Sequence, residues 1–182
     1  MNTDRMFLEK YYRLAELLTS GAEEVVNKVK YFSDKPAEYL DSEYGEYCCY
    51  EEDDLDDLAA DPGNLLGSYL WDILYGILNR EHFIFRLDWR AFHKDIEFAV
   101  NSLLARRGLP AEDALLSEID GKMPTWDALN IIASKLEPGG LTLAFADDGS
   151  DSFPVVIVQN YDLDELKRVS DEIGLSIKTH FA

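Results

Sequence analysis

The most constraining feature of the sequence is a pair of strand patterns joined by a tight turn near its carboxyl end. Residues 141–146 and 153–159 are rich in strand-forming side chains, and the intervening Asp-Asp-Gly-Ser-Asp has the composition of a hairpin turn. In the second strand, residues 155–158 are continuously apolar, which is typical of a central strand covered on both faces. The pattern therefore predicts an antiparallel hairpin at the centre of a sheet.

A regular succession of strand and helix patterns surrounds this hairpin. From residue 82 the patterns predict strand 82–87, helix 91–107, a weaker helix 111–119, helix 125–136, strands 141–146 and 153–159, helix 162–173 and strand 175–180. Without the two inserted helices the order is β-α-β-β-α-β, the split βαβ arrangement. We therefore expect an α+β fold with a four-stranded, mainly antiparallel sheet from about residue 82 onward.

Two of these helices begin with residue types that cap helices. Thr125 precedes an apolar helical pattern, and threonine is a common N-cap. Asp162 is followed three residues later by Glu165, which is the spacing of a capping box. We expect both side chains to accept hydrogen bonds from the first turn of their helices.

The part of the chain before residue 80 reads as helical. Apolar residues recur at helical spacing within residues 7–18 and 25–32, and residues 65–78 are apolar over most of a helix circumference. We expect a single domain over residues 1–182. It would comprise N-terminal helices (1–35) packed on the sheet, an acidic, tyrosine-rich loop segment (36–62) and an α+β body (63–182).

Negative charge is concentrated in one segment. The chain carries a formal charge of −19, and residues 36–79 hold 12 acidic side chains and no lysine or arginine, which leaves −7 on the rest. Such a charge repels nucleic-acid phosphates and anionic membrane surfaces. We therefore expect neither nucleic acid nor a membrane as a partner.

Three further features predict a cytoplasmic protein. No apolar run approaches the roughly 20 residues that span a bilayer. The amino terminus lacks a basic stretch followed by an apolar one, the pattern of a secretory signal. Cys48 and Cys49 are adjacent, so a bridge between them would be strained, and we expect reduced thiols.

The first candidate binding surface is formed by tyrosines interleaved with carboxylates. Tyrosine offers a large, rigid contact area with a hydrogen-bonding tip, and clustered carboxylates attract a basic protein over long range. A solvated acidic loop that only aids solubility would have the same composition. The candidate residues are Tyr39, Tyr44, Glu46, Tyr47, Tyr50, Glu51, Glu52, Asp53 and Asp54.

The second candidate is a pocket between the sheet and the N-terminal helices. Asp88 and Arg90 lie at a predicted strand-to-helix junction, and ligands often bind at the carboxyl end of a strand. Helix capping by Asp88 and an ion pair of Arg90 explain the same residues structurally. The polar groups of this pocket would be Asp88, Arg90, His93 and Asp147.

Motifs of catalysis and metal binding are not found. The sequence has no GxSxG, no GxxxxGK[ST] and no GxGxxG after a strand, and its three histidines lack HExxH spacing. The turn at residues 147–151 resembles the start of a calcium loop, but Val155 stands where that loop requires glutamate. We expect no catalytic residue, cofactor or metal site, with divalent-cation binding by residues 51–57 as a further alternative.

Two short motifs resemble those of a family of uncharacterised bacterial proteins. They are the corner Leu87-Asp88-Trp89-Arg90, where the family has L-x-D-W-[KR], and the hairpin Asp151-Ser152-Phe153, where the family has D-S-[FY]. The likeness covers roughly residues 65–180. It implies no activity and no catalytic residues, and the acidic, tyrosine-rich segment is particular to this sequence.

These observations predict a non-enzymatic binding protein for a basic protein partner, of the immunity-protein or antitoxin type. Such an inhibitor needs a surface of carboxylates and tyrosines but no catalytic apparatus. The alternative is a small-ligand-binding protein or an enzyme that uses the pocket between sheet and helices.

Overall fold

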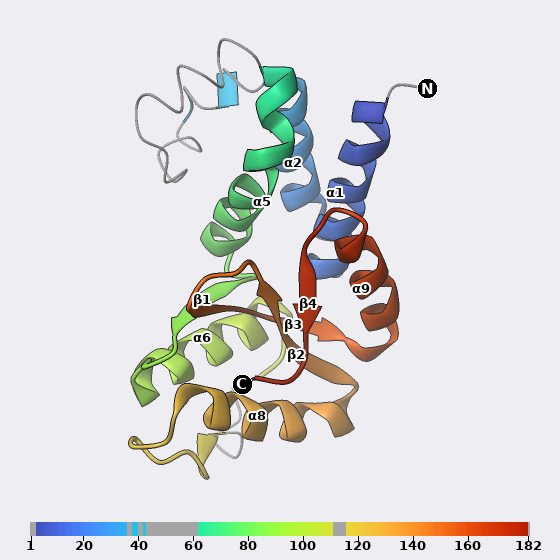
Figure 1. Ribbon diagram of the computed structural model, residues 1–182. Helices are drawn as coiled ribbons and strands as arrows, with labels where there is room; N and C mark the ends of the chain where they lie inside the picture. Colours follow the sequence, from blue (N-terminus) through green and yellow to red (C-terminus); the bar gives the residue numbers. More distant parts are fainter. Residues whose placement is uncertain (1–2, 36–37, 40–41, 43–61, 111–115, 182) are drawn as a thin grey trace. The chain divides into compact units, whose positions relative to one another are not determined.

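The computed structural model describes residues 3–35, 38–39, 42, 62–110 and 116–181 (Figure 1). The chain divides into two compact units, Met1–Glu81 and His82–Ala182. The prediction of one domain over residues 1–182 stays a prediction. In the described part of the chain, no helix is both long and apolar enough to cross a bilayer.

The N-terminal unit is built from helices α1 (Thr3–Thr19), α2 (Glu23–Asp34) and α5 (Pro62–Arg80), which pack on one another (Figure 1). The turn between α1 and α2 requires left-handed backbone at Ser20 (φ 55°) and Gly21 (φ 83°). Thr19 supports this turn, since its hydroxyl donates to the Ala15 carbonyl at 2.7 Å and accepts from the Ala22 N–H at 3.1 Å.

The core of this unit consists of the apolar stripes expected from the helical spacing. Its fully buried side chains include Leu14, Leu18, Val25, Val29, Phe32, Leu70, Ile73, Leu74 and Leu78. Burying one such aliphatic side chain stabilises the fold by about 1.5–3 kcal/mol. The helix predicted from residues 65–78 is thus confirmed as α5, and its described second half is a core element.

The C-terminal unit contains a four-stranded antiparallel sheet. Its strands are β1 (Phe85–Asp88), β2 (Leu141–Asp147), β3 (Ser152–Gln159) and β4 (Ser176–Lys178), in the order β1-β3-β2-β4. In the central strand β3, Val155, Val156, Ile157 and Val158 are all at most 1% exposed, as the continuous apolar run predicts.

The strand order confirms the split βαβ arrangement. Because β3 is antiparallel to both of its neighbours, β1 and β2 run parallel to each other with β3 between them. By the same reasoning β3 and β4 run parallel with β2 between them. The fold is therefore α+β, as predicted, with two interlocked split βαβ units.

Helices α6 (His93–Arg106) and α8 (Thr125–Leu136) cover one face of this sheet (Figure 1). That face contributes Leu87, Leu143, Phe145, Phe153, Val155 and Ile157 to a core shared with the two helices. A 3-10 turn (η2, Glu137–Gly139) leads from α8 to β2. A second (η3, Asn160–Asp162) leads from β3 to α9 (Leu163–Asp171), which packs against β4.

Both capping predictions are wrong in detail. The N-cap position of α8 is Pro124 rather than Thr125, and the Thr125 hydroxyl is buried with no hydrogen-bond partner among the described residues. Asp162 does hold the N-cap position of α9, but its side chain makes no capping hydrogen bond. In α6, by contrast, the Asp95 carboxylate accepts a hydrogen bond from the Phe92 N–H at 3.1 Å and so caps the start of the helix.

The first strand begins later than its composition suggests. His82 has left-handed backbone (φ 59°) within a turn, residues 83–84 are irregular, and β1 starts at Phe85. Phe83 and Ile84 are nevertheless buried. Apolar composition alone cannot distinguish a buried turn from a strand.

Candidate functional site

A hollow of about 530 Å³ lies at the end of the sheet where β1 and β2 finish. Because these two strands run parallel, their carboxyl ends meet at the same edge, a place where the loops that follow can enclose a ligand. The lining residues are Trp89, Trp126, Phe145, Asp147, Ser150, Asp151, Ser152, Phe153 and Lys178. We call this the aromatic hollow.

Four of the residues that line the aromatic hollow are aromatic. Phe145 and Phe153 meet edge to face at 5.3 Å between ring centroids, and the Phe181 ring packs against both, at 4.8 Å from Phe145 and 5.7 Å from Phe153. Trp126, on the first turn of α8, is half-buried against this core. Trp89 follows β1 and is 39% exposed.

The Trp89 ring already accepts a cation from its own loop. The guanidinium carbon of Arg90 lies 3.8 Å from the centroid of the ring. This is a close cation–π stack, in which the electron-rich face of the indole attracts the positive charge. An indole has two faces, and Arg90 occupies one of them.

The hairpin turn beside the aromatic hollow is held by Arg86. Its guanidinium donates to Asp148 at 2.7 Å, to the Ser150 hydroxyl at 2.9 Å and to the Ser152 hydroxyl at 3.0 Å. Partial burial raises the pKa of Asp148, but hydrogen bonds from Ser150 and Arg86 outweigh burial and hold it below its usual value. The charged Asp148 carboxylate thus helps to hold the conformation of the turn.

Asp147 is paired in a similar way. Its carboxylate accepts a hydrogen bond from the Lys178 ammonium on β4 and another from the Gly149 N–H at 3.3 Å. These two bonds hold the pKa of Asp147 below its usual value. Gly149 itself has φ 79°, a left-handed conformation that favours glycine at this turn.

The third carboxylate of the turn, Asp151, is different. It lines the aromatic hollow and forms no ion pair with any described residue. The charged groups that line the hollow are therefore one ion pair, Asp147 with Lys178, and one additional carboxylate.

The two short motifs noted in the sequence meet at this site. In the register of β1 and β3, Leu87 pairs with Phe153 and Asp88 pairs with Ser152. The Asp88 carboxylate accepts a hydrogen bond from the Arg90 N–H at 2.6 Å, which fixes the corner that carries Trp89. The corner and the hairpin therefore form one edge of the aromatic hollow.

The structure places the four polar residues predicted for a pocket, Asp88, Arg90, His93 and Asp147, in different positions. Asp147 lines the aromatic hollow. Asp88 and Arg90 are the sequence neighbours of Trp89, but they do not line the hollow. His93 begins α6, with its Nδ1 3.9 Å from a carboxylate oxygen of Glu97. Sequence reasoning missed Trp126, Phe145, Phe153 and Lys178, because no local pattern reveals which apolar and basic side chains reach this end of the sheet.

Most of the predicted acidic surface lies outside the described residues. Tyr44, Glu46, Tyr47, Tyr50, Glu51, Glu52, Asp53 and Asp54 all do. Tyr39 is described and only 2% exposed, and its ring packs on Phe32 at 5.3 Å and on Tyr31 at 5.9 Å. Tyr39 is thus a core residue of the N-terminal unit.

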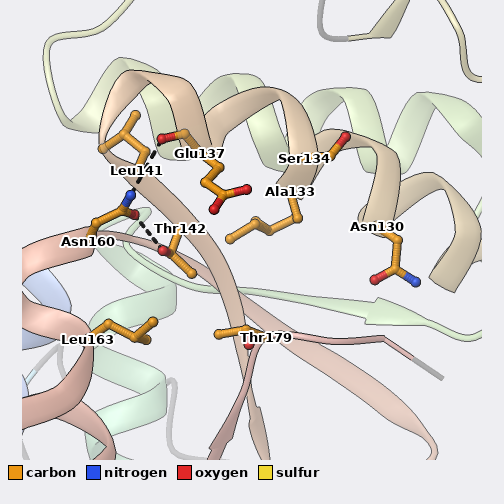
Figure 2. Close-up of a pocket in the computed structure, with 10 residues that line it drawn as sticks. Asn130, Ala133, Ser134, Glu137, Leu141, Thr142, Asn160, Leu163 and Thr179 are labelled. Carbon is orange, nitrogen blue, oxygen red and sulfur yellow. Dashed lines mark hydrogen bonds between the residues drawn. The ribbon is translucent and has the colours of Figure 1, made fainter.

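A second hollow of about 460 Å³ lies between the end of α8 and the start of α9 (Figure 2). Figure 2 shows Asn160 between Thr142 and Glu137, accepting from the Thr142 hydroxyl at 2.5 Å and donating to the Glu137 carbonyl at 3.4 Å. Asn130 bonds the backbone of Phe181, and the Ser134 hydroxyl bonds the Ile131 carbonyl. These polar groups hold the fold together, so the aromatic hollow is the better candidate for a site.

Comparisons with known proteins identify the family of this chain but no activity. A family model described as a domain of unknown function (DUF6630) matches residues 10–181. The sequence matches no curated protein and no solved structure. Among the residues that the structure describes, no three histidine, cysteine or acidic side chains are grouped as they would be to hold a metal ion.

Proposed function

The chain belongs to the DUF6630 family, and we propose that it is a binding protein whose aromatic hollow holds a small ligand. The observation that carries this proposal is that four aromatic side chains, Trp89, Trp126, Phe145 and Phe153, line one hollow together with five polar or charged residues. Ligand sites are typically concave, with aromatic and apolar side chains and with polar groups that fix the orientation of the ligand.

The polar groups of the aromatic hollow favour binding over catalysis. The hydroxyls of Ser150 and Ser152 lie 2.9 Å apart and both accept from Arg86. A serine nucleophile would need a neighbouring base to take its proton, whereas a guanidinium can only donate. Lys178 and Asp147 neutralise each other in the same way. These contacts position groups around a ligand without activating any of them.

The tryptophans provide a direct test. The chain has three, and two of them, Trp89 and Trp126, line the aromatic hollow. The indole N–H signals of ¹⁵N-labelled protein would be followed during titration with benzamide, benzamidine and benzoate, three probes of one size and different charge. Trp71→Phe assigns the remaining signal, since Trp71 lies in α5 of the other unit.

We expect at least one probe to shift the Trp89 and Trp126 signals saturably and to leave that of Trp71 in place. Trp126→Ala should abolish saturation, whereas Tyr161→Ala, at a ring that is 80% exposed on η3, should not. If no probe produces a saturable shift, or if Trp71 responds equally, the proposal is wrong.

A basic protein partner is the second candidate function. It is supported by the 12 acidic and no basic side chains of residues 36–79, a distribution that steers a cationic protein towards that segment. An inhibitor of a basic toxin, as immunity proteins are, would use such a segment. Binding would then depend on charge rather than on the aromatic hollow.

This second candidate is tested with the product of a toxin-like gene next to the gene for this chain. Its affinity would be measured between about 50 and 300 mM salt, because screening between exposed charges strengthens with ionic strength. A variant with Glu51, Glu52, Asp53 and Asp54 changed to their amides should bind weakly, and Trp126→Ala should bind normally. Absent or salt-independent binding argues against this candidate.

A further inference from the structure

The lining of the aromatic hollow has two features that attract positive charge. One is the electron-rich faces of its aromatic rings. The other is the carboxylate of Asp151, which remains after Lys178 has paired with Asp147. Both attract cations. From this juxtaposition we infer that the aromatic hollow binds an organic cation with a flat or compact head, such as a guanidinium or amidinium group. The inference rests on the proposed function.

The neighbourhood of Trp89 shows which head group suits this surface. Arg90 stacks its planar guanidinium on the indole at 3.8 Å. Guanidinium is weakly hydrated for a cation and stacks well on aromatic rings, so its removal from water costs less than that of an ammonium. A ligand head of the same kind can use the other rings of the hollow, including Trp126 on the first turn of α8.

The two carboxylates that line the hollow, Asp147 and Asp151, differ in their partners. Asp147 accepts a hydrogen bond from Lys178, so its charge is already compensated. Asp151 lies three positions after Asp148, which Arg86 neutralises at 2.7 Å, and has no cation of its own among the described residues. The bound cation would therefore pair with Asp151, and Lys178 would limit affinity by repulsion.

Two substitutions should act in opposite directions on cation binding. Asp151→Asn removes the unpaired charge and should weaken benzamidine binding about fivefold, in the range of one exposed charge pair. Lys178→Met removes the repelling ammonium and leaves Asp147 to face the hollow, so it should tighten benzamidine binding by a similar factor. Neither substitution should change the affinity for the neutral probe benzamide by more than about twofold. A merely structural role of these residues would not strengthen binding in either variant.

Affinities would be measured by titration calorimetry on the full chain, with the three probes and both variants. We expect benzamidine to bind more tightly than benzamide, and benzamide more tightly than benzoate. If benzamide binds as well as benzamidine, or benzoate binds best, this inference is overturned while the proposed ligand site stands. If no probe binds, the proposed function itself fails.

A cationic head could be carried by a free metabolite or by an arginine side chain of a peptide. Agmatine presents a guanidinium without a peptide backbone, and the tripeptide Gly-Arg-Gly presents the same guanidinium on one. N-acetylcitrulline amide is the neutral control. Tighter binding of agmatine indicates a small-molecule ligand, and tighter binding of the tripeptide indicates a peptide. Equal binding of the citrulline compound and of both guanidinium compounds would contradict the inference.

Discussion

Thr125 places a polar group in the interior of the C-terminal unit. Its side chain is 1% exposed, and its hydroxyl has no hydrogen-bond partner among the described residues. A buried hydroxyl in this state costs about 1–3 kcal/mol. Thr125→Val keeps the shape and removes the hydroxyl, so we expect the melting temperature to rise by about 2–4 °C.

The control for Thr125→Val is Thr125→Ser, which keeps the hydroxyl and removes a buried methyl group. It should lower the melting temperature. A lower melting temperature for Thr125→Val as well would show that the hydroxyl has a partner in solution, such as a bound water.

Tyr11 makes the free energy of unfolding depend on pH in the alkaline range. Burial, and to a smaller extent the charge of Asp72, raises the pKa of Tyr11 to about 12. In the unfolded chain a tyrosine ionises near its ordinary value of about 10. Above that pH the unfolded state loses this proton while the folded state keeps it, so ionisation of Tyr11 favours unfolding.

We therefore expect the free energy of unfolding to fall with increasing pH above about 10, and less steeply in Tyr11→Phe than in the unsubstituted chain. Urea unfolding at a series of pH values measures the slope. Tyr161→Phe is the matched control, because it removes the same hydroxyl from a ring that is 80% exposed. Equal slopes in all three proteins would contradict the burial of the Tyr11 hydroxyl.

At the scale of elements, Asn130 joins helix α8 to the C-terminal segment. Its amide donates to the Phe181 carbonyl at 2.9 Å and accepts from the Phe181 N–H at 3.2 Å. Asn130→Leu leaves both backbone groups without partners, and we expect a loss of about 1–3 kcal/mol. Urea unfolding and the hydrogen-exchange rate of the Phe181 amide measure it.

Ser134→Ala is a suitable comparison one turn further along α8. Ser134 is exposed, and its hydroxyl donates to the Ile131 carbonyl of its own helix. This variant should change stability by less than about 0.5 kcal/mol, as substitutions away from packing contacts usually do. If Asn130→Leu and Ser134→Ala behave alike, the link to Phe181 does not stabilise the fold.

The elements could be predicted from the sequence where their patterns were local. The apolar run of β3 and the spacing of α8 are examples, and the split βαβ order follows from them. The start of β1 could not be predicted, because the left-handed backbone of His82 places a buried turn where a strand was expected. The predicted caps at Thr125 and Asp162 were wrong in detail, because the exact first residue of a helix and the side-chain rotamer there depend on packing that the local sequence does not show.

The site was less predictable than the fold. The Asp88–Arg90 corner and the turn at Asp147 were visible as separate features, and the register of β1 and β3 brings them to one edge. Trp126 and Lys178 come from α8 and β4, and their position depends on how these elements cross the sheet. Such long-range placement has no local signal in one sequence.

For the molecule as a whole, the net charge of −19 predicts a dependence of stability on salt. Mutual repulsion of like charges destabilises a compact chain, and dissolved ions screen it. We expect the melting temperature to rise by several degrees between about 10 and 300 mM sodium chloride. Differential scanning calorimetry measures it, and a melting temperature that falls with salt would mean that ion pairs such as Arg86 with Asp148 outweigh the repulsion.

The strand order has a consequence for synthesis on the ribosome. Among the strands that the structure describes, β1 pairs only with β3, and the whole of residues 89–151 is translated between them. The nascent helices of the N-terminal unit can pack once Glu81 has emerged, because α1, α2 and α5 contact one another within residues 1–81. The edge of β1 stays unpaired until Ser152–Gln159 emerges, so sheet formation is a late event with distant contacts, the kind that is slow and open to aggregation. A pause in translation after residue 88 would lengthen the time for which this edge is exposed.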